Sequence, residues 1–258
     1  MIFYFSITFF VFGLIFGSFL NVCIYRLPRK KSVVWPSSFC PECQSPIKPL
    51  DNIPLISYLL LRGQCRNCHT KISWRYPLVE VLTGVLFGGL FLKFGFSQEI
   101  IALLILAVLL VVITFIDIEF KLILNVITIP GIVIGGILSW HLGSMDLIQI
   151  GLGLLIGGGL LIGIALFGKK LFGKDSMGMG DIKMAAMIGV FIGAKGIALA
   201  IFLSFLIAGI FSFIGLSLKK IKRTSYIPFG PFIAAGTVVY IFFGEQIINW
   251  YLTFSGLK

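Results

Sequence analysis

Charged side chains are scarce in this sequence. They make up 12% of the 258 residues, and only ten residues are acidic. A soluble domain carries about a quarter charged residues, so the composition excludes an ordinary soluble globular protein. Apolar residues account for 58% of the chain. They form runs such as 100–116 and 197–218, and about 17–25 such residues cross a bilayer. The sequence therefore predicts a membrane protein.

Histidine is rarer still, with only His69 and His141. There is no H-E-x-x-H pair, which excludes that class of zinc peptidase. His141 is expected on the opposite side of the membrane from the acidic loops, which argues against a Ser-His-Asp site. The first apolar segment lacks a basic N-terminal region and an A-x-A site. We therefore expect a retained helix there and no cleaved signal peptide.

The apolar segments predict an all-α polytopic membrane protein with about eight transmembrane helices. Segment 182–194 is too short to span comfortably, and a broken helix is tolerated only where it packs in protein or lines a wet cavity. The segments are 2–25, 77–96, 99–116, 124–142, 147–168, 182–194, 196–218 and 228–250.

The connecting loops alternate between basic and nearly neutral. Eighteen of the 21 Lys and Arg residues lie in 26–76, 117–123, 169–183 and 219–227, and the other connections and ends hold three. The positive-inside pattern places the basic loops in the cytoplasm and both termini outside. A basic face for nucleic acid is disfavoured because the cations are dispersed over four loops.

Four of the five cysteines lie in the first basic loop, as the pairs Cys40/Cys43 and Cys65/Cys68. Two C-x2-C pairs separated by 21 residues are typical of a tetrahedral Zn²⁺ site with four thiolates. Disulfides are the alternative, but a cytoplasmic loop keeps its thiols reduced. Four protein ligands leave no open position, so this zinc is expected to be structural. We expect His69 to be a bystander beside the four thiolates.

Ionisable residues at the edges of apolar segments are informative because they are costly there. Two of them, Asp117 and Asp181, fall at the same cytoplasmic boundary on different helices. Taken singly, each is explained as a helix-end residue, with Asp181 as an N-cap. Taken together, they can share a proton, activate a water and protonate a leaving amine. The other candidates are Glu80, Glu119, Lys183 and Glu245. For Glu80 the alternatives are a structural hydrogen bond and a contact with substrate. We expect Lys183 to reach lipid phosphate, with contact to a nearby carboxylate as the alternative.

Seven stretches along the chain resemble the bacterial type IV prepilin peptidases, also called leader peptidase/N-methyltransferases, with "GMGDIKM" similar to their G-x-G-D motif. The stretches are "GSFLNVCIYRLP" (17–28), the two C-x2-C pairs, "NIPLISYLLLRG" (52–63), "SWRYPLVEVLTG" (73–84), "TFIDIEFKLILN" (114–125), "MGMGDIKM" (177–184) and "IPFGPFIAAG" (227–236).

The resemblance implies a membrane endopeptidase of the bacterial inner membrane that removes the leader of type IV prepilins and pseudopilins at the cytoplasmic face. Many members of the family then methylate the new N-terminus with S-adenosylmethionine. The catalytic aspartates of the family fall on Asp117 and Asp181. We expect Gly178 and Gly180 to let substrate backbone approach Asp181 closely. One departure is Asn125, which stands where the family often has an aspartate.

The resemblance also implies a division by role into a first transmembrane helix (1–25), a cytoplasmic zinc-binding loop (26–76) and a transmembrane aspartyl peptidase domain (77–258). Two other functions stay open on the residues alone. A transporter would use its intramembrane carboxylates to carry ions, but would show a related arrangement in both halves. A scaffold built on the zinc loop would tolerate loss of both aspartates.

Overall fold

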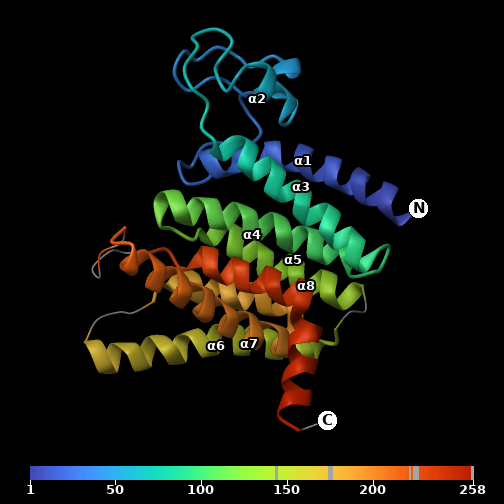
Figure 1. The fold of residues 1–258 in the computed structure, drawn as a ribbon, viewed down its shortest axis with the longest axis vertical. Helices are drawn as coiled ribbons and strands as arrows, with labels where there is room; N and C mark the ends of the chain where they lie inside the picture. Colours follow the sequence, from blue (N-terminus) through green and yellow to red (C-terminus); the bar gives the residue numbers. More distant parts are fainter. Residues whose placement is uncertain (143–144, 174–176, 221, 223–226, 257–258) are drawn as a thin grey trace. The chain divides into compact units, whose positions relative to one another are not determined.

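The computed structural model describes residues 1–142, 145–173, 177–220, 222 and 227–256. Most of these residues are helical, and residues 27–74 are mainly loop (Figure 1). The described part of the chain contains no β-strand, only two isolated antiparallel bridges. In chain order the elements are α1 (Ile2–Arg26), the 3-10 helix η1 (Pro49–Asn52), α2 (Ile56–Leu60), α3 (Arg75–Phe94), α4 (Ile100–Phe120), α5 (Asn125–His141), α6 (Leu147–Phe172), α7 (Met179–Ser217) and α8 (Gly230–Phe254).

Six of these helices, α1, α3, α4, α6, α7 and α8, are long and apolar enough to cross a membrane. The shorter α5 is also apolar, with 17 residues. These lengths confirm the prediction of an all-helical, multi-pass membrane protein. The short α2 lies within the first basic loop, where no transmembrane segment was predicted.

Helix α7 contains the short segment that the sequence singled out. It runs for 39 residues, but Gly193 has non-helical backbone angles (φ 71°, ψ 177°). Such a positive φ is readily adopted only by glycine. The two predicted segments, 182–194 and 196–218, are therefore two helical stretches of one element that join at Gly193.

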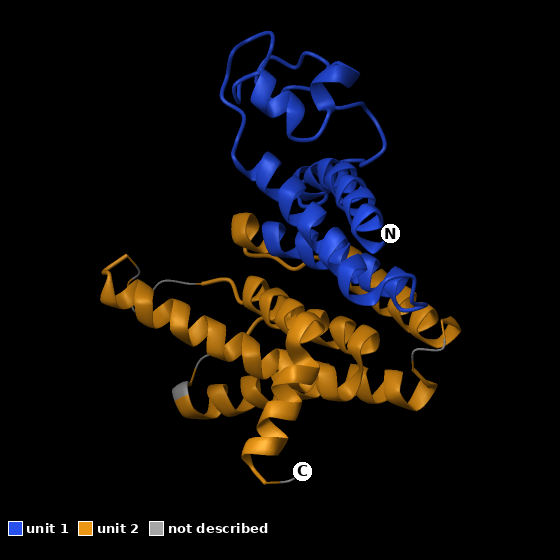
Figure 2. Ribbon diagram, turned by 45° about the vertical axis from the view of Figure 1, so that its right-hand side comes forward, with its two compact units in different colours: residues 1–116 blue, residues 117–258 orange. Residues whose placement is uncertain are grey.

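The chain divides into two compact units, residues 1–116 and 117–258 (Figure 2). In the first unit, α1 packs along α3 through Gly13 and Gly17. A Cβ atom on either glycine would lie 2.7 Å from a backbone Cα of α3, that of Gly84 or Glu80. This G-x-x-x-G spacing lets the two backbones approach closely, as is common between membrane helices.

The second unit is built around α7, which packs against α5, α6 and α8. A Cβ atom on Gly153 of α6 would collide with the backbone of Gly189 on α7. On the α8 side, a Cβ atom on Gly236 would collide with Ser204 and with the backbone of Ala200. Gly153 and Gly236 therefore allow close packing between the helices of this chain.

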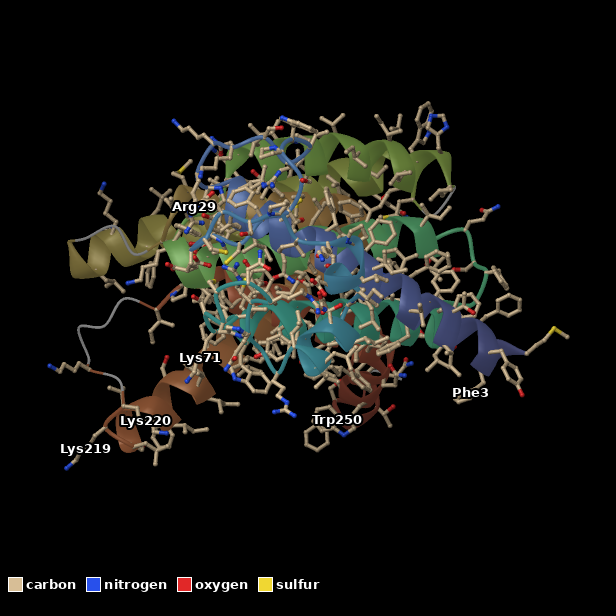
Figure 3. The ribbon with its side chains drawn as sticks, turned by 90° about the horizontal axis from the view of Figure 1, so that it is seen from above. Phe3, Arg29, Lys71, Lys219, Lys220 and Trp250 are labelled. Carbon is tan, nitrogen blue, oxygen red and sulfur yellow. The ribbon has the colours of Figure 1, made fainter. Side chains whose placement is uncertain are left out.

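The distribution of charge in the first unit follows the alternation seen in the sequence. Figure 3 shows Phe3 and Arg29 near opposite ends of α1, with Lys71 toward the same end as Arg29. In the second unit, Lys219 and Lys220 directly follow the C-terminal end of α7 (Figure 3). These basic residues lie in the loops that the sequence assigns to the cytoplasmic side.

Candidate functional site

Asp117 lies in the last turn of α4 and is only 4% exposed. Its Oδ2 accepts a hydrogen bond of 3.0 Å from the backbone N–H of Gly230. Gly230 is the first residue of α8, and the N-terminus of a helix carries partial positive charge that favours a carboxylate. The start of α8 therefore holds one oxygen of Asp117.

Asp181 is the third residue of α7 and is 7% exposed. The N-cap of this helix is Gly178, so the structure differs from the alternative in which Asp181 itself is the N-cap. A Cβ atom on Gly178 would be 3.2 Å from Asp181 Oδ2, so the carboxylate lies beside the N-cap residue. This resembles one half of a capping box, in which an acid at N3 reaches back to the N-cap.

The two carboxylates lie in the same unit, and Gly180 and Gly230, which neighbour Asp181 and Asp117, both lie against Ile123. Each carboxylate is buried, and each lies at the start of a helix, α8 for Asp117 and α7 for Asp181. Two acids with this relationship can divide the work of proton transfer, one as base and one as acid.

Ile123, in the connection between α4 and α5, lies against both of the helix starts that hold these acids. A Cβ atom on Gly180 would be 2.7 Å from Ile123 Cβ, and one on Gly230 would be 3.3 Å from Ile123 Cδ1. The side chain of Ile123 thus fills the space that Gly180 leaves open. The glycine is required for packing within the chain, and its expected contact with substrate stays a prediction.

Lys183 Nζ donates a hydrogen bond of 2.9 Å to Asn125 Oδ1. Asn125 is the first residue of α5, and Lys183 lies in the second turn of α7. The expectation from sequence was contact with lipid phosphate, or with a carboxylate. The structure instead joins Lys183 to Asn125, the position at which this chain departs from the pattern of the family it resembles.

Sequence reasoning did not assign roles to Gly230, Ile123 or Asn125. Gly230 had one visible signal, because it lies between Phe229 and Pro231 at the start of a predicted apolar segment. Its contact with Asp117 joins residues 113 positions apart. Spacing within one motif cannot show such a contact.

The remaining acidic candidates have other environments. Glu80, in α3 of the first unit, is buried and its Oε2 accepts a hydrogen bond of 2.9 Å from the backbone N–H of Leu55. Glu119 and Glu245 are exposed. The structural hydrogen bond weighed for Glu80 is therefore present.

The four loop cysteines converge in the first unit. The sulfur atoms of Cys40, Cys43, Cys65 and Cys68 all lie within 4.8 Å of one another. Cys40 Sγ and Cys68 Sγ are 3.8 Å apart, and a tetrahedral ion with metal–sulfur bonds of about 2.3 Å separates its ligands by about 3.8 Å. All four thiols are free of disulfides. The donor set and its spacing fit a metal ion.

The two cysteine pairs adopt the same turn. In the first, Cys40 N donates to Ser45 O and Gln44 N to Cys40 O. In the second, Cys65 N donates to Thr70 O and His69 N to Cys65 O. Gln44 and His69 both have positive φ values, 57° and 56°. His69 therefore occupies the position of a turn residue, and it lies outside the four-sulfur group.

Hydrogen bonds favour the thiolate form in both turns. The hydroxyl and backbone of Thr70 lower the pKa of Cys68 to about 6, and Ser45 lowers the pKa of Cys43 in the same way. Burial raises the pKa of Cys40 to about 11. Since metal ligands must be thiolates, a bound ion would displace a proton from Cys40.

Comparison with known proteins gives matches along most of the chain. Residues 11–94 match the bacterial peptidase A24 N-terminal domain, and residues 104–213 match the type IV leader peptidase family. Among similar curated proteins are three named prepilin leader peptidase/N-methyltransferase. The protein from Pseudomonas aeruginosa is 34% identical over 95% of this chain and 93% of its own length. Those from Aeromonas hydrophila and Bacillus subtilis are 37% and 33% identical, covering 97% and 94% of this chain and 94% and 96% of their own. No solved structure matches the chain.

The fold and the site define a multi-pass helical membrane protein with a buried pair of aspartates in one unit and a four-cysteine cluster in the other. The chain belongs to the type IV leader peptidase family. This confirms the resemblance noted from the sequence, and it argues against the transporter alternative.

Proposed function

We propose that the protein is a membrane aspartyl endopeptidase that removes the leader peptide of type IV prepilins or pseudopilins. Membership of the family and relatives named prepilin leader peptidase/N-methyltransferase along nearly the whole chain support this activity. The single observation that carries the chemistry is that the carboxylates of Asp117 and Asp181 are both buried, within one unit and at the starts of two helices.

In the proposed reaction, one aspartate is ionised and takes a proton from the attacking water. The other is protonated and polarises the scissile carbonyl, and the two then exchange roles as the amine leaves. The dyad titrates as a coupled pair, so neither proton is assigned to a single residue. The backbone N–H of Gly230 fixes the Asp117 carboxylate before substrate binds, which reduces the cost of orienting it in the transition state.

Gly178 and Gly180 are proposed to lie beside the substrate backbone. Both belong to the start of α7, within three residues of Asp181. A Cβ atom on Gly178 would be 3.2 Å from Asp181 Oδ2, so a side chain there would crowd the carboxylate. The cleaved segment of a prepilin would approach this uncrowded side of the acid.

The second proposed activity is methylation of the new N-terminus with S-adenosylmethionine as the methyl donor. The names of the relatives support it. S-adenosylmethionine supplies an electrophilic methyl group to the unprotonated amine. In the proposed division by role, the loop of residues 26–76 serves this activity, and residues 77–258 serve cleavage.

The ion proposed at Cys40, Cys43, Cys65 and Cys68 is Zn²⁺. Four thiolates at tetrahedral spacing suit this ion and leave no position for water or substrate. The ion would join the two cysteine turns and stabilise a loop that has little regular structure of its own. No catalytic step is assigned to it.

The proposed location is the bacterial inner membrane, with the aspartates and the cysteine loop on the cytoplasmic side. The concentration of Lys and Arg in four loops supports this orientation, because such residues are retained on the cytoplasmic side. A prepilin would present its basic leader at that side and its apolar helix within the bilayer.

Co-expression with a prepilin tests both activities. Membranes that contain the protein and a prepilin should yield a shortened pilin on immunoblots, and mass spectrometry should place the cut after a glycine. The same spectrum should show an added methyl group on the new N-terminus. An uncut prepilin would contradict the proposal for cleavage, and a cut but unmodified amine would contradict the proposal for methylation alone.

A further inference from the structure

The short helix α2 (Ile56–Leu60) presents an apolar stripe to its surroundings. We define the α2 stripe as Ile56, Leu59 and Leu60, which are 55%, 73% and 78% exposed. Their spacing of i, i+3 and i+4 puts them on one face of the helix. Ser57, on another face, is buried and its hydroxyl donates to Leu50 O. The helix thus turns its polar side inward and its apolar side outward.

One end of α2 is fixed beside a membrane-spanning helix. The backbone N–H of Leu55 donates a hydrogen bond of 2.9 Å to Glu80 Oε2. Glu80 is the sixth residue of α3, about 7.5 Å along the helix from Arg75 at 1.5 Å per residue. Since helical side chains tilt toward the N-terminus, Leu55 lies beside the first two turns of α3. That helix is a candidate membrane span.

A second contact also places α2 near the start of α3. Trp74 directly precedes α3 and is 78% exposed. Its ring lies 5.7 Å from the ring of Tyr58 on α2. Tryptophan next to a spanning segment is typical of the membrane–water interface. The two contacts, from Leu55 and from Tyr58, therefore hold α2 beside the N-terminal end of α3, a candidate membrane span. In Figures 1 and 2 the loop that contains α2 lies beyond this end of the α1 and α3 pair.

The charges around α2 suit an anionic lipid surface. The apolar stretch 49–61 is flanked by Lys48 and Arg62, both exposed. The loop between α1 and α3 carries seven Lys and Arg residues and two acids. One of these acids, Asp51, is paired with Arg66. Long basic side chains beside an apolar face reach lipid phosphates while their stems stay in apolar surroundings.

We infer that α2 lies in the headgroup region of the bilayer, with the α2 stripe in contact with acyl chains, so that the cysteine loop is anchored to the membrane surface. Lipid is the occupant we infer because α2 is fixed beside the first turns of a candidate membrane span and its apolar stretch has exposed basic residues at both ends. Leu78, in the first turn of the span α3, is also an exposed apolar side chain. An apolar face with basic flanks is typical of helices that lie in the interface. The inference depends on α3 spanning a membrane and is independent of the proposed activities.

Lipid contact can be measured directly in the full-length protein. An environment-sensitive fluorescent amino acid replaces Leu59 in one variant, and in a matched control it replaces Glu42, an exposed residue of the same loop. Both proteins are placed in nanodiscs of phosphatidylcholine and phosphatidylglycerol, with increasing amounts of a lipid that carries a doxyl quencher. Metal content and a single gel-filtration peak establish that each variant is folded.

The label at position 59 is expected to emit at shorter wavelength than the label at position 42, and to lose at least half of its emission to the doxyl lipid. The label at position 42 is expected to be quenched by aqueous iodide and little by the lipid. Equal lipid quenching at both positions, or none at position 59, would overturn the inference. A photo-crosslinker at position 59 gives a second readout. Adducts with lipid support the inference, whereas adducts with a second copy or with a pilin, without lipid adducts, contradict it.

Discussion

The backbone N–H of Gly230 donates to Asp117 Oδ2 at 3.0 Å, and a methyl group on Gly230 would lie 2.7 Å from that same oxygen. One residue thus both holds the carboxylate and leaves room for it. The contact joins Asp117 to the start of α8, which lies 113 residues later in the chain. It makes the start of α8 part of the proposed active site.

Replacement of Gly230 by alanine should therefore impair cleavage. The new Cβ would push the Asp117 carboxylate from its place, and a displacement of about 1 Å can cost about 100-fold in rate. We expect the initial rate of leader removal to fall between about tenfold and 100-fold. The measurement is a timed immunoblot of prepilin processing in membranes with equal amounts of enzyme.

Gly209→Ala is the matched control, because nothing lies within 4 Å of a Cβ atom at that position of α7. Its rate should equal that of the unchanged protein. A Gly230→Ala variant that processes prepilin at the normal rate would show that this contact does not position Asp117.

The contact of Ile123 with Gly180 can be separated from a contact of Gly180 with substrate. Gly180→Ala places its new Cβ 2.7 Å from Ile123 Cβ, so cleavage should fall. A second change, Ile123→Gly, removes the Ile123 side chain that the new Cβ at position 180 would contact. If Gly180 serves packing within the chain, the double variant should process prepilin faster than Gly180→Ala alone. No recovery, with Ile123→Gly itself active, would point to substrate as the neighbour that needs the space.

Lys183 and Asn125 should act as a pair. A hydrogen bond of this kind contributes about 0.5–1.5 kcal/mol net, so Lys183→Met and Asn125→Ala are each expected to reduce cleavage by less than about tenfold. The two side chains are in contact, so either single change already breaks the hydrogen bond. The double variant should therefore process prepilin no more slowly than the less active of the two single variants. Asn125→Asp keeps an acceptor and adds an opposite charge, so it should retain activity. Fully additive losses in processing rate would contradict the pairing.

Loss of the cysteine cluster should affect metal content and the loop more than cleavage. Elemental analysis is expected to find zinc in the unchanged protein and to find none in a Cys40→Ser/Cys43→Ser variant. Structural zinc contributes about 10–16 kcal/mol to the folding of small zinc domains, so the loop of this variant should become sensitive to protease. Leader removal should persist, and methylation of the mature N-terminus should be lost.

Cys23→Ala provides the control for this experiment, since Cys23 lies in α1, outside the four-sulfur group. It should keep both zinc and methylation. A double variant that retains the metal, or unchanged protein without zinc, would contradict the assignment of the ion. Methylation without the cluster would show that the transfer does not depend on the loop.

Local patterns were sufficient to predict several features. The C-x2-C pairs predicted a cluster because each pair forms one tight turn, and the two turns are indeed alike. The short segment 182–194 predicted an interruption in a membrane helix, and the structure has one at Gly193. The aspartates were identified because carboxylates are costly beside apolar segments.

Contacts between distant segments could not be predicted in this way. The side chain of Ile123 looks like any apolar residue of a loop, yet it meets two helix starts that follow it by 57 and 107 positions. The sequence NIPLISYLLLRG contributed to the resemblance, but its short helix and outward apolar stripe depend on the bonds of Leu55 and Ser57 to other segments. These features arise from contacts between segments, and the spacing of residues within one segment does not show which other segment it will contact.

The measurement that bears most directly on the proposed chemistry is leader removal by the Asp117→Asn and Asp181→Asn variants, each co-expressed with a prepilin. Asparagine has nearly the same size as aspartate but cannot exchange a proton, so the fold and zinc content should be unchanged. Each variant is predicted to leave the prepilin uncut, with processing below the detection limit of the immunoblot. Normal cleavage by either variant would show that the two aspartates are not a catalytic pair.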